Sequence, residues 1–150
     1  VNTACNFDNL GFDTSAIFKI GEDIYSEGIL DSFKNRGVKL NNIIQKADTS
    51  TGFSIILVSF QGDRTVLAHR GANAEIREDE INYDAIKDAD LIYVAPLNGE
   101  SNKVLEPIVE YAHQLGTRIC FNAGTTSIKR GFEHIKTILK SAHIVVMNKE

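Results

Sequence analysis

The stretch FSIILVSFQGDRTVLAH, residues 53–69, predicts a β-hairpin. Two runs rich in apolar and β-branched residues, 53–60 and 64–69, flank the short turn Gln61-Gly62-Asp63. Strands that follow each other so closely pair antiparallel, whereas parallel strands need a longer connection. The rest of the chain has a different pattern, so we expect this hairpin to stand off one side of a separate α/β layer.

Short apolar strands alternate with amphipathic helices on both sides of this hairpin. Upstream we expect a helix that stops at Gly11, a strand over 15–21, and a helix over about 23–36 that Gly37 ends. Downstream the pattern predicts helices over 78–89, 101–115 and 128–141, and strands over 91–95, 118–121 and 143–147. Near-continuous apolar strands joined through helices are typical of a parallel sheet covered by helices. The predicted fold class is therefore α/β.

The length, the net charge and the cysteines of the chain indicate which kinds of protein it could be. A chain of 150 residues is long enough for one domain with a sizeable core. The net charge of −4 favours neither nucleic acid nor an anionic membrane surface as a partner, and no apolar stretch approaches the roughly 20 residues that span a bilayer. Cys5 and Cys120 are far apart and form no metal or disulfide motif. We interpret them as free thiols, which favours a cytoplasmic protein.

Several short motifs follow one another along the whole chain. They are Asn2-x-Ala4 with Gly11 and Gly21, Ser50-Thr51-Gly52-Phe53, Gly62-Asp63-Arg64-Thr65 with Gly71-Ala72-Asn73, Leu97-Asn98-Gly99-Glu100, Phe121-Asn122-Ala123-Gly124, and Met147-Asn148-Lys149-Glu150. This ordered set resembles the ribokinase-like (PfkB) carbohydrate kinases. In that comparison the motifs correspond to the N-terminal signature, the lid hairpin, a substrate-side loop, an Asn-Pro-Gly-type turn and the start of an Asn-x-x-Glu motif.

The resemblance implies a ribokinase-like three-layer α/β/α fold with a mostly parallel sheet. A β-hairpin lid over about residues 50–70 would be inserted in the α/β layer. Residues 1–150 would then be a partial, truncated kinase domain, because the Gly-Gly pair that precedes the signature Asn and the Asp-Thr-x-Gly-Ala-Gly-Asp type segment are both missing from the sequence. By resemblance that second segment carries the catalytic base, so we expect no catalytic residue within 1–150.

The activity that the resemblance implies is ATP-dependent phosphorylation of a sugar hydroxyl, as in ribokinase or fructokinase, with Mg²⁺ as the second cofactor. A small-molecule sugar would be the substrate, and a homodimer would form through the lid, with Phe53, Ile55, Leu57, Val66 and Ala68 suited to the partner subunit. Two alternatives stay open. One is a nucleoside (adenosine-type) kinase of the same family, and the other is a non-catalytic sugar-binding or assembly module.

Seven residues are the candidate site. Asn2 corresponds to the family's sugar-binding Asn, and an amide offers both a donor and an acceptor to vicinal hydroxyls. Gly21 ends a strand, where ligands of open α/β sheets bind. Gly71, Ala72 and Asn73 would let the backbone approach the sugar, Glu100 would accept a hydrogen bond from a sugar hydroxyl, and Asn148 would help to organise phosphate and Mg²⁺.

Six of these residues also have an ordinary structural interpretation. Asn2 would cap a helix or lie in a frayed terminus, and Gly21, Gly71 and Asn73 would be turn residues. Glu100 would favour a helix N-terminus, with Ser101 as a possible N-cap, and Asn148 would end a strand. The four histidines lack metal-ligand spacing, so no metal site is predicted from the side chains of the chain itself.

Overall fold

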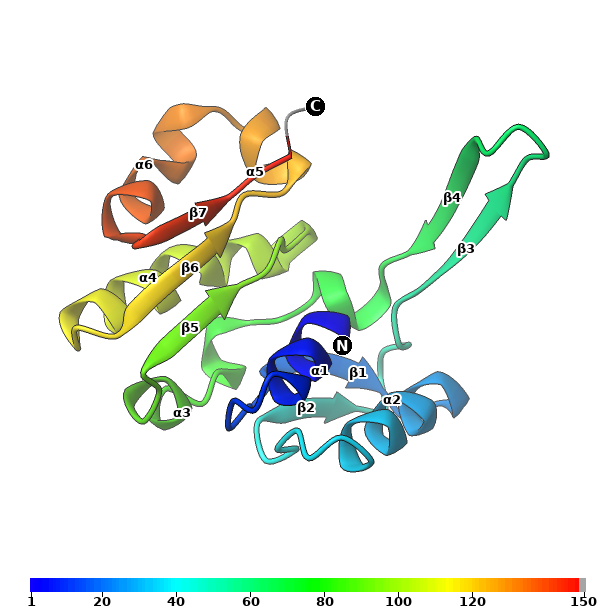
Figure 1. Cartoon of the computed structure of the whole chain (residues 1–150), viewed down its shortest axis with the longest axis horizontal. Helices are drawn as coiled ribbons and strands as arrows, with labels where there is room; N and C mark the ends of the chain where they lie inside the picture. Colours follow the sequence, from blue (N-terminus) through cyan, green and yellow to red (C-terminus); the bar gives the residue numbers. More distant parts are fainter. Residues whose placement is uncertain (149–150) are drawn as a thin grey trace. The chain divides into compact units, whose positions relative to one another are not determined.

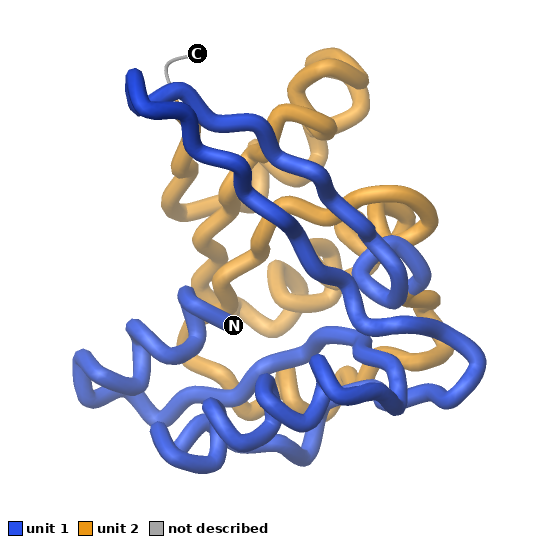
Figure 2. The backbone as a smooth tube through the Cα atoms, turned by 90° about the vertical axis from the view of Figure 1, so that its right-hand side faces the viewer, with its two compact units in different colours: residues 1–75 blue, residues 76–150 orange. Residues whose placement is uncertain are grey.

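A computed structural model describes residues 1–148 of the chain. The backbone divides into two compact units, Val1–Glu75 and Ile76–Glu150 (Figure 2). Each unit contains parallel strands that alternate with helices, and the first unit also carries the hairpin (Figure 1). Of the predicted motif at residues 147–150, Lys149 and Glu150 lie outside the described residues.

The first unit packs two helices against a pair of parallel strands. Its elements before the hairpin are α1 (Asn2–Asn9), β1 (Phe18–Gly21), α2 (Ile24–Lys34) and β2 (Ile43–Lys46). β1 pairs with β2 in parallel, with Phe18 opposite Ile43. A small core joins Cys5 of α1 to Phe33 of α2, and the Phe33 ring meets the edge of the Phe18 ring at 5.4 Å. β1 is shorter than the strand predicted over 15–21, and β2 was not predicted.

Glycines end both helices of this unit as predicted. Gly11 after α1 has φ +87°, and the Phe12 amide donates to the Phe7 carbonyl at 3.1 Å. Gly37 after α2 has φ +77°, and the Val38 amide donates to the Phe33 carbonyl at 3.2 Å. A residue with a Cβ rarely adopts this left-handed conformation, so glycine allows the chain to turn sharply back into the sheet.

The hairpin predicted from residues 53–69 is confirmed. β3 (Phe53–Val58) pairs antiparallel with β4 (Arg64–His69), from Phe53 opposite His69 to Val58 opposite Arg64. β3 ends earlier than the predicted run 53–60 because Ser59 closes a longer turn, whereas β4 has the predicted bounds. The Ser59 amide donates to the Asp63 carbonyl at 2.8 Å, and Ser59 Oγ accepts from the Asp63 amide at 3.1 Å. Gly62 supplies the left-handed residue of that turn, with φ +89°.

The five hairpin residues expected to face a partner together do not share one face. Directly opposite residues of an antiparallel pair point to the same side, and the side alternates along each strand. The register pairs Ile56 with Val66 and Ser54 with Ala68. One face therefore carries Phe53, Ile55, Leu57 and Leu67, and the other carries Ile56, Val58, Val66 and Ala68. Both faces are apolar and largely exposed.

The second unit is a three-stranded parallel sheet with helices in its connections. Its strands are β5 (Leu91–Val94), β6 (Arg118–Asn122) and β7 (Ile144–Val146), in the order β5-β6-β7. The helices α4 (Leu105–Gln114) and α6 (Phe132–Ser141) pack against each other and against β6. Short elements fill the remaining connections, namely η2 (Glu78–Glu80), α3 (Asp84–Lys87), η3 (Gly99–Val104) and α5 (Thr125–Lys129).

Three predicted helices of this unit are interrupted. The predicted helix over 78–89 breaks into η2 and α3, because Ile81 is extended and the Asn82 side chain accepts from the Asp84 amide at 3.2 Å. The predicted helix over 101–115 begins as the 3₁₀ segment η3 and becomes α-helical at Leu105. Gly131, with φ +93°, separates α5 from α6 within the predicted helix over 128–141. Among the described residues, no helix combines the length and the apolar character needed to cross a membrane.

We predict that Phe33→Ala destabilises the protein by about 3–5 kcal/mol, because it removes a fully buried ring and leaves a cavity between α1, α2 and β1. Urea unfolding followed by circular dichroism measures the change. Phe60→Ala is the matched control, since the Phe60 side chain is fully exposed in the hairpin turn, and we expect a change within about 0.5 kcal/mol. Equal losses for the two variants would contradict this description of the core.

Candidate functional site

The candidate residues of the first unit, Asn2 apart, meet where β1 ends and the hairpin begins. Gly21 is the last residue of β1 and is buried. Gly71, Ala72 and Asn73 form the 3₁₀ segment η1 (Gly71–Ala74), which follows β4 and packs against β1. The segment 50–52, which leads into β3, contacts both groups. The Gly21 amide donates to Thr51 Oγ1 at 3.0 Å, and the Ala72 amide donates to the Ser50 carbonyl at 2.8 Å.

Three glycines let the backbone cross itself at this point. A Cβ on Gly21 would lie 2.4 Å from the Thr49 carbonyl oxygen, and one on Gly71 would lie 2.2 Å from the Ser50 carbonyl oxygen. A Cβ on Gly52 would lie 2.2 Å from Asn73 Nδ2. These neighbours are mostly backbone atoms, which cannot move aside as a flexible side chain would. The glycines therefore have a structural reason to be there in addition to any contact with a ligand.

One carboxylate joins the β1–α2 turn to the segment that enters the hairpin. Asp23 Oδ1 accepts from the Tyr25 and Ser26 amides at 3.1 and 3.0 Å and so caps α2. Asp23 Oδ2 accepts from the Thr51 amide at 2.7 Å. The pKa of the Asp23 carboxyl lies below its usual value, mainly because the carboxylate accepts this hydrogen bond from the Thr51 amide.

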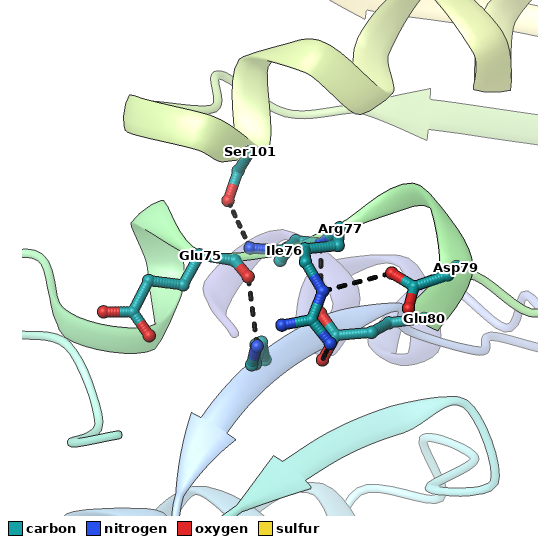
Figure 3. A network of polar contacts seen from close by, with 7 residues as sticks. Glu75, Ile76, Arg77, Asp79, Glu80 and Ser101 are labelled. Carbon is teal, nitrogen blue, oxygen red and sulfur yellow. Dashed lines mark hydrogen bonds and ion pairs between the residues drawn. The ribbon is translucent and has the colours of Figure 1, made fainter. Parts of the chain in front are cut away.

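A buried lysine holds the segment that leaves the hairpin. Lys19, in the middle of β1, is 3% exposed, and its Nζ donates to the Glu75 carbonyl at 3.0 Å. Figure 3 shows this carbonyl and, at the next residue, the Ile76 amide. That amide donates to Ser101 Oγ at 2.8 Å within the second unit (Figure 3). Ser101 is therefore a buried acceptor inside η3, and the expectation that it caps a helix is wrong.

The candidate residues of the second unit lie beyond the carboxyl ends of its parallel strands. Glu100 belongs to η3, which follows β5, and Asn148 comes two residues after β7. The exposed Glu100 carboxylate accepts from Lys103 Nζ at 2.5 Å, so it forms a surface ion pair within its own turn. Asn148 is exposed.

Polar side chains connect the loops at this edge of the second unit. Thr126 Oγ1 donates to Asn98 Oδ1 at 2.8 Å, which links the loop after β5 to the first turn of α5, the helix that follows β6. Asn122 Nδ2 donates to the Tyr93 hydroxyl at 2.8 Å. A Cβ on Gly124 would lie 2.4 Å from Pro96 Cβ, so the Asn122-Ala123-Gly124 turn packs directly on the β5 loop. Parallel strands place all their carboxyl ends at one edge, where ligands of α/β folds bind.

Asn2 is the first residue of α1, and its side chain is exposed. The N-cap of α1 is Val1, and no side chain caps this helix. The interpretation of Asn2 as a helix cap is therefore wrong.

The sequence predictions missed three residues of the first unit that organise this region. They are Lys19, Asp23 and Thr51. Two signals were available. Asp23 precedes a helical pattern and has Ser26 three residues later, which is the spacing of a capping box. Lys19 interrupts an apolar strand, and a lysine is rarely buried without a partner.

A protein family matches the sequence over the whole chain. The model described as "pfkB family carbohydrate kinase" matches residues 1–150. The chain belongs to the pfkB family of carbohydrate kinases. An uncharacterized sugar kinase of Archaeoglobus fulgidus is 30% identical over 145 residues, which cover 94% of this chain and 56% of the relative. The chain thus spans little more than half the length of that relative.

Solved structures show that the fold is ribokinase-like. Arabidopsis thaliana ribokinase complexed with ribose and ATP superposes with a TM-score of 0.80 at 16% identity, over 99% of this chain and 47% of that chain. A Burkholderia thailandensis nucleoside kinase in complex with inosine gives 0.80 at 18% identity, over 99% and 47%. The predicted family and the predicted α/β fold class, with mostly parallel strands, are confirmed.

We predict that Gly21→Ala lowers the free energy of unfolding by about 1–3 kcal/mol, because the new methyl group would overlap the backbone of Thr49 and Thr51. Gly28→Ala in α2 is the matched control. A Cβ there meets nothing within 4 Å, so the higher helix propensity of alanine leaves stability unchanged or raises it by up to about 1 kcal/mol. Chemical denaturation of both variants measures the difference. A neutral Gly21→Ala would show that the crossing is looser than the structure indicates.

Proposed function

We propose that this chain is the substrate-binding part of an ATP-dependent sugar kinase that phosphorylates a sugar hydroxyl, as ribokinase and fructokinase do. The observation that carries the proposal is the crossing at the hairpin base. It brings Gly21 and Gly71–Asn73 together at the carboxyl end of β1, beside a lid-like hairpin. Membership of the pfkB family and the sugar-kinase relative support the same reaction class.

The proposed sugar contacts in the first unit combine an amide side chain with the backbone of η1, in which Gly71 is partly exposed and Ala72 is fully buried. Asn2 would pair with vicinal hydroxyls through its donor and its acceptor. Gly71 and Ala72 would approach the sugar through their backbone, and the exposed Asn73 side chain would add a further polar contact. Such groups hold and orient a substrate rather than react with it, which fits a phosphoryl transfer that depends mainly on positioning.

The proposed roles in the second unit are to contact the sugar and to organise phosphate. Glu100 would have to exchange its ion pair with Lys103 for a hydrogen bond from a sugar hydroxyl. Because both side chains are exposed, this exchange costs little. Asn148 would act near the phosphates from the end of β7.

Within residues 1–148, no group of three or more His, Cys, Asp or Glu side chains is placed to hold a metal ion. The sequence also has no Walker-type phosphate loop. ATP and Mg²⁺ are proposed as cofactors because the chain belongs to the pfkB family.

The hairpin would exclude water from the transferred phosphoryl group when the sugar is bound. Both of its faces are apolar, and a two-stranded ribbon is marginally stable when it stands alone. A closed lid protects a reactive phosphoryl group from hydrolysis. This accounts for an apolar hairpin next to candidate residues that are mainly polar or glycine.

A nucleoside kinase is the second candidate, and an aromatic cluster favours it. The Tyr25 ring stacks on the Phe53 ring with 5.1 Å between centroids, and the His69 ring lies 5.3 Å from Phe53. Tyr25 and Phe53 are 54% and 38% exposed, so they offer an aromatic surface at the lid base on which a nucleobase could lie. A non-catalytic sugar-binding or assembly module predicts binding without ATP consumption.

We propose a cytoplasmic location on the basis of the cysteines. Cys5 and Cys120 are both buried free thiols, and burial raises the pKa of the Cys120 thiol. Buried thiols of this kind persist in a reducing compartment.

The test is ATP consumption by the full-length protein with ribose, fructose, other hexoses and nucleosides. We expect a sugar to be phosphorylated, and Asn2→Ala to raise the KM for that sugar about tenfold or more through the lost hydrogen bonds. Asn9→Ala is the matched control, since Asn9 is an exposed asparagine at the other end of α1. Sugar binding without ATP turnover would support the non-catalytic module, and turnover of nucleosides alone would support the second candidate.

We further propose that the complete protein is a homodimer through the hairpin. Tyr25 of α2 already covers part of the face that carries Phe53 and Ile55, so the opposite face, with Ile56 and Val66, is the one proposed to meet a second copy. This replaces the mixed set of five residues expected from the sequence.

Light scattering at micromolar concentration is the test of the dimer. We expect a dimer for the wild type and a monomer for Ile56→Lys, because a buried, unpaired charge is incompatible with an apolar interface. Ile55→Lys is the matched control on the other face, and we expect it to remain dimeric. A wild-type monomer with a protected hairpin would disprove the proposed interface.

A further inference from the structure

The carboxylate of Asp23 uses its two oxygens for two different tasks. Oδ1 caps α2 through the Tyr25 and Ser26 amides, and the Asp23 amide in turn donates to Ser26 Oγ at 3.2 Å. A helix cap needs a single side-chain oxygen. Oδ2 is therefore surplus to the cap, and it accepts from the amide of Thr51, which is 28 residues further along the chain.

Thr51 is the point at which the hairpin is attached to the β1–α2 turn. Its amide donates to Asp23 Oδ2 at 2.7 Å, and its Oγ1 accepts from the Gly21 amide at 3.0 Å. The Thr51 side chain is 2% exposed. Thr51 is thus held from both its amide and its side chain, two residues before β3 begins.

The two ends of the hairpin are coupled at the same place. Next to Thr51, the Ser50 carbonyl accepts from the Ala72 amide at 2.8 Å, and Ser50 Oγ lies 2.8 Å from His69 Nε2. The two ends also pass close to each other, since a Cβ on Gly52 would lie 2.5 Å from the Arg70 carbonyl oxygen and one on Gly71 would lie 2.2 Å from the Ser50 carbonyl oxygen. A displacement of Thr51 would consequently move both the hairpin and the Gly71–Asn73 segment.

From this geometry we propose that Asp23 is a positioning residue of the lid. It holds Thr51 and thereby sets the orientation of the hairpin and of Gly71–Asn73 toward a bound sugar, without touching the sugar itself. This inference rests on the proposed sugar-kinase function. The depressed pKa of the Asp23 carboxyl agrees with a charged acceptor of these amide hydrogen bonds at neutral pH.

Replacing Asp23 with asparagine separates the capping of α2 from the contact with Thr51. Asp23→Asn keeps one oxygen and replaces the other with an NH₂ group, which cannot accept from the Thr51 amide. Asparagine caps helices as well as aspartate does, so the α2 cap survives. Asp23→Ser provides a second variant that also retains a capping oxygen and lacks the second acceptor.

The experiment measures amide hydrogen exchange and steady-state kinetics on the full-length protein. For Asp23→Asn and Asp23→Ser we expect about tenfold faster exchange at Thr51 and in residues 53–69, with unchanged exchange in α2. We also expect the KM for the sugar to rise about tenfold.

Ser26→Ala is the matched control because it removes the other half of the capping box and leaves Asp23 Oδ2 in place. We expect it to weaken α2 and to leave the exchange at Thr51 and the KM unchanged.

Wild-type exchange at Thr51 in both Asp23 variants would overturn the proposal, as would faster exchange with an unchanged KM. An equal effect of Ser26→Ala would overturn it too, since the cap alone would then explain the result. The exchange measurement requires no substrate, so it reports on the attachment of the hairpin even if the substrate panel shows no sugar phosphorylation. Failure of the proposed function is thereby distinguished from failure of this inference.

Discussion

The crossing of backbone segments at the base of the hairpin is the constraint on which the first unit depends. Three segments meet there, namely the end of β1, the segment 50–52 and η1, and glycines face the contacts where a side chain would overlap backbone. Backbone amides and carbonyls buried at such a crossing need partners. Thr51 Oγ1, the Ser50 carbonyl and the Asp23 carboxylate supply them. The candidate residues Gly21 and Gly71–Asn73 therefore belong to a region built mainly from backbone.

Both units use the direction of parallel strands to gather polar groups at one edge. In the first unit the Asp23 carboxylate, two residues after β1, accepts from the Thr51 amide, and in the second unit Thr126 of α5 donates to Asn98 in the loop after β5. Loops at the carboxyl ends are free to vary, while the strands that carry them are set by apolar packing. Buried apolar residues such as Phe33 and Phe121 fold the two units, whereas the candidates Glu100 and Asn148 are exposed and the candidates Gly21 and Ala72 are buried parts of the backbone crossing.

The elements that sequence predicted well are those whose signals are local. The hairpin has β-rich runs around a glycine turn, and Gly11 and Gly37 end their helices with positive φ. β2 was missed because half of its four residues are polar, and its place is set by pairing with β1. The helix over 78–89 failed because the Asn82 side chain starts a new turn, which competes with helix continuation.

Only part of the candidate site could be predicted from the sequence. The glycines and Gly71–Asn73 follow from the family motifs, and the structure brings those of the first unit together. The role of Ser101 was wrong because its partner, the Ile76 amide, is 25 residues away in the chain. Neither role of Asp23 was predicted. The spacing of its capping box is a local signal, whereas its contact with Thr51, 28 residues away, leaves no local signal.

The hairpin is long, and it is attached to the rest of the first unit only near its base. Each of its strands has six residues, which corresponds to a reach of about 20 Å at about 3.4 Å per residue. At that distance from the base, a rotation of roughly 10° moves the turn at 59–63 by about 3–4 Å. A displacement of this size is enough to make or break a hydrogen bond. A small change of orientation at the base of the hairpin therefore causes a larger displacement of the turn. Small sequence changes near the crossing would shift what the far end can touch, while changes in the turn itself would have only local consequences.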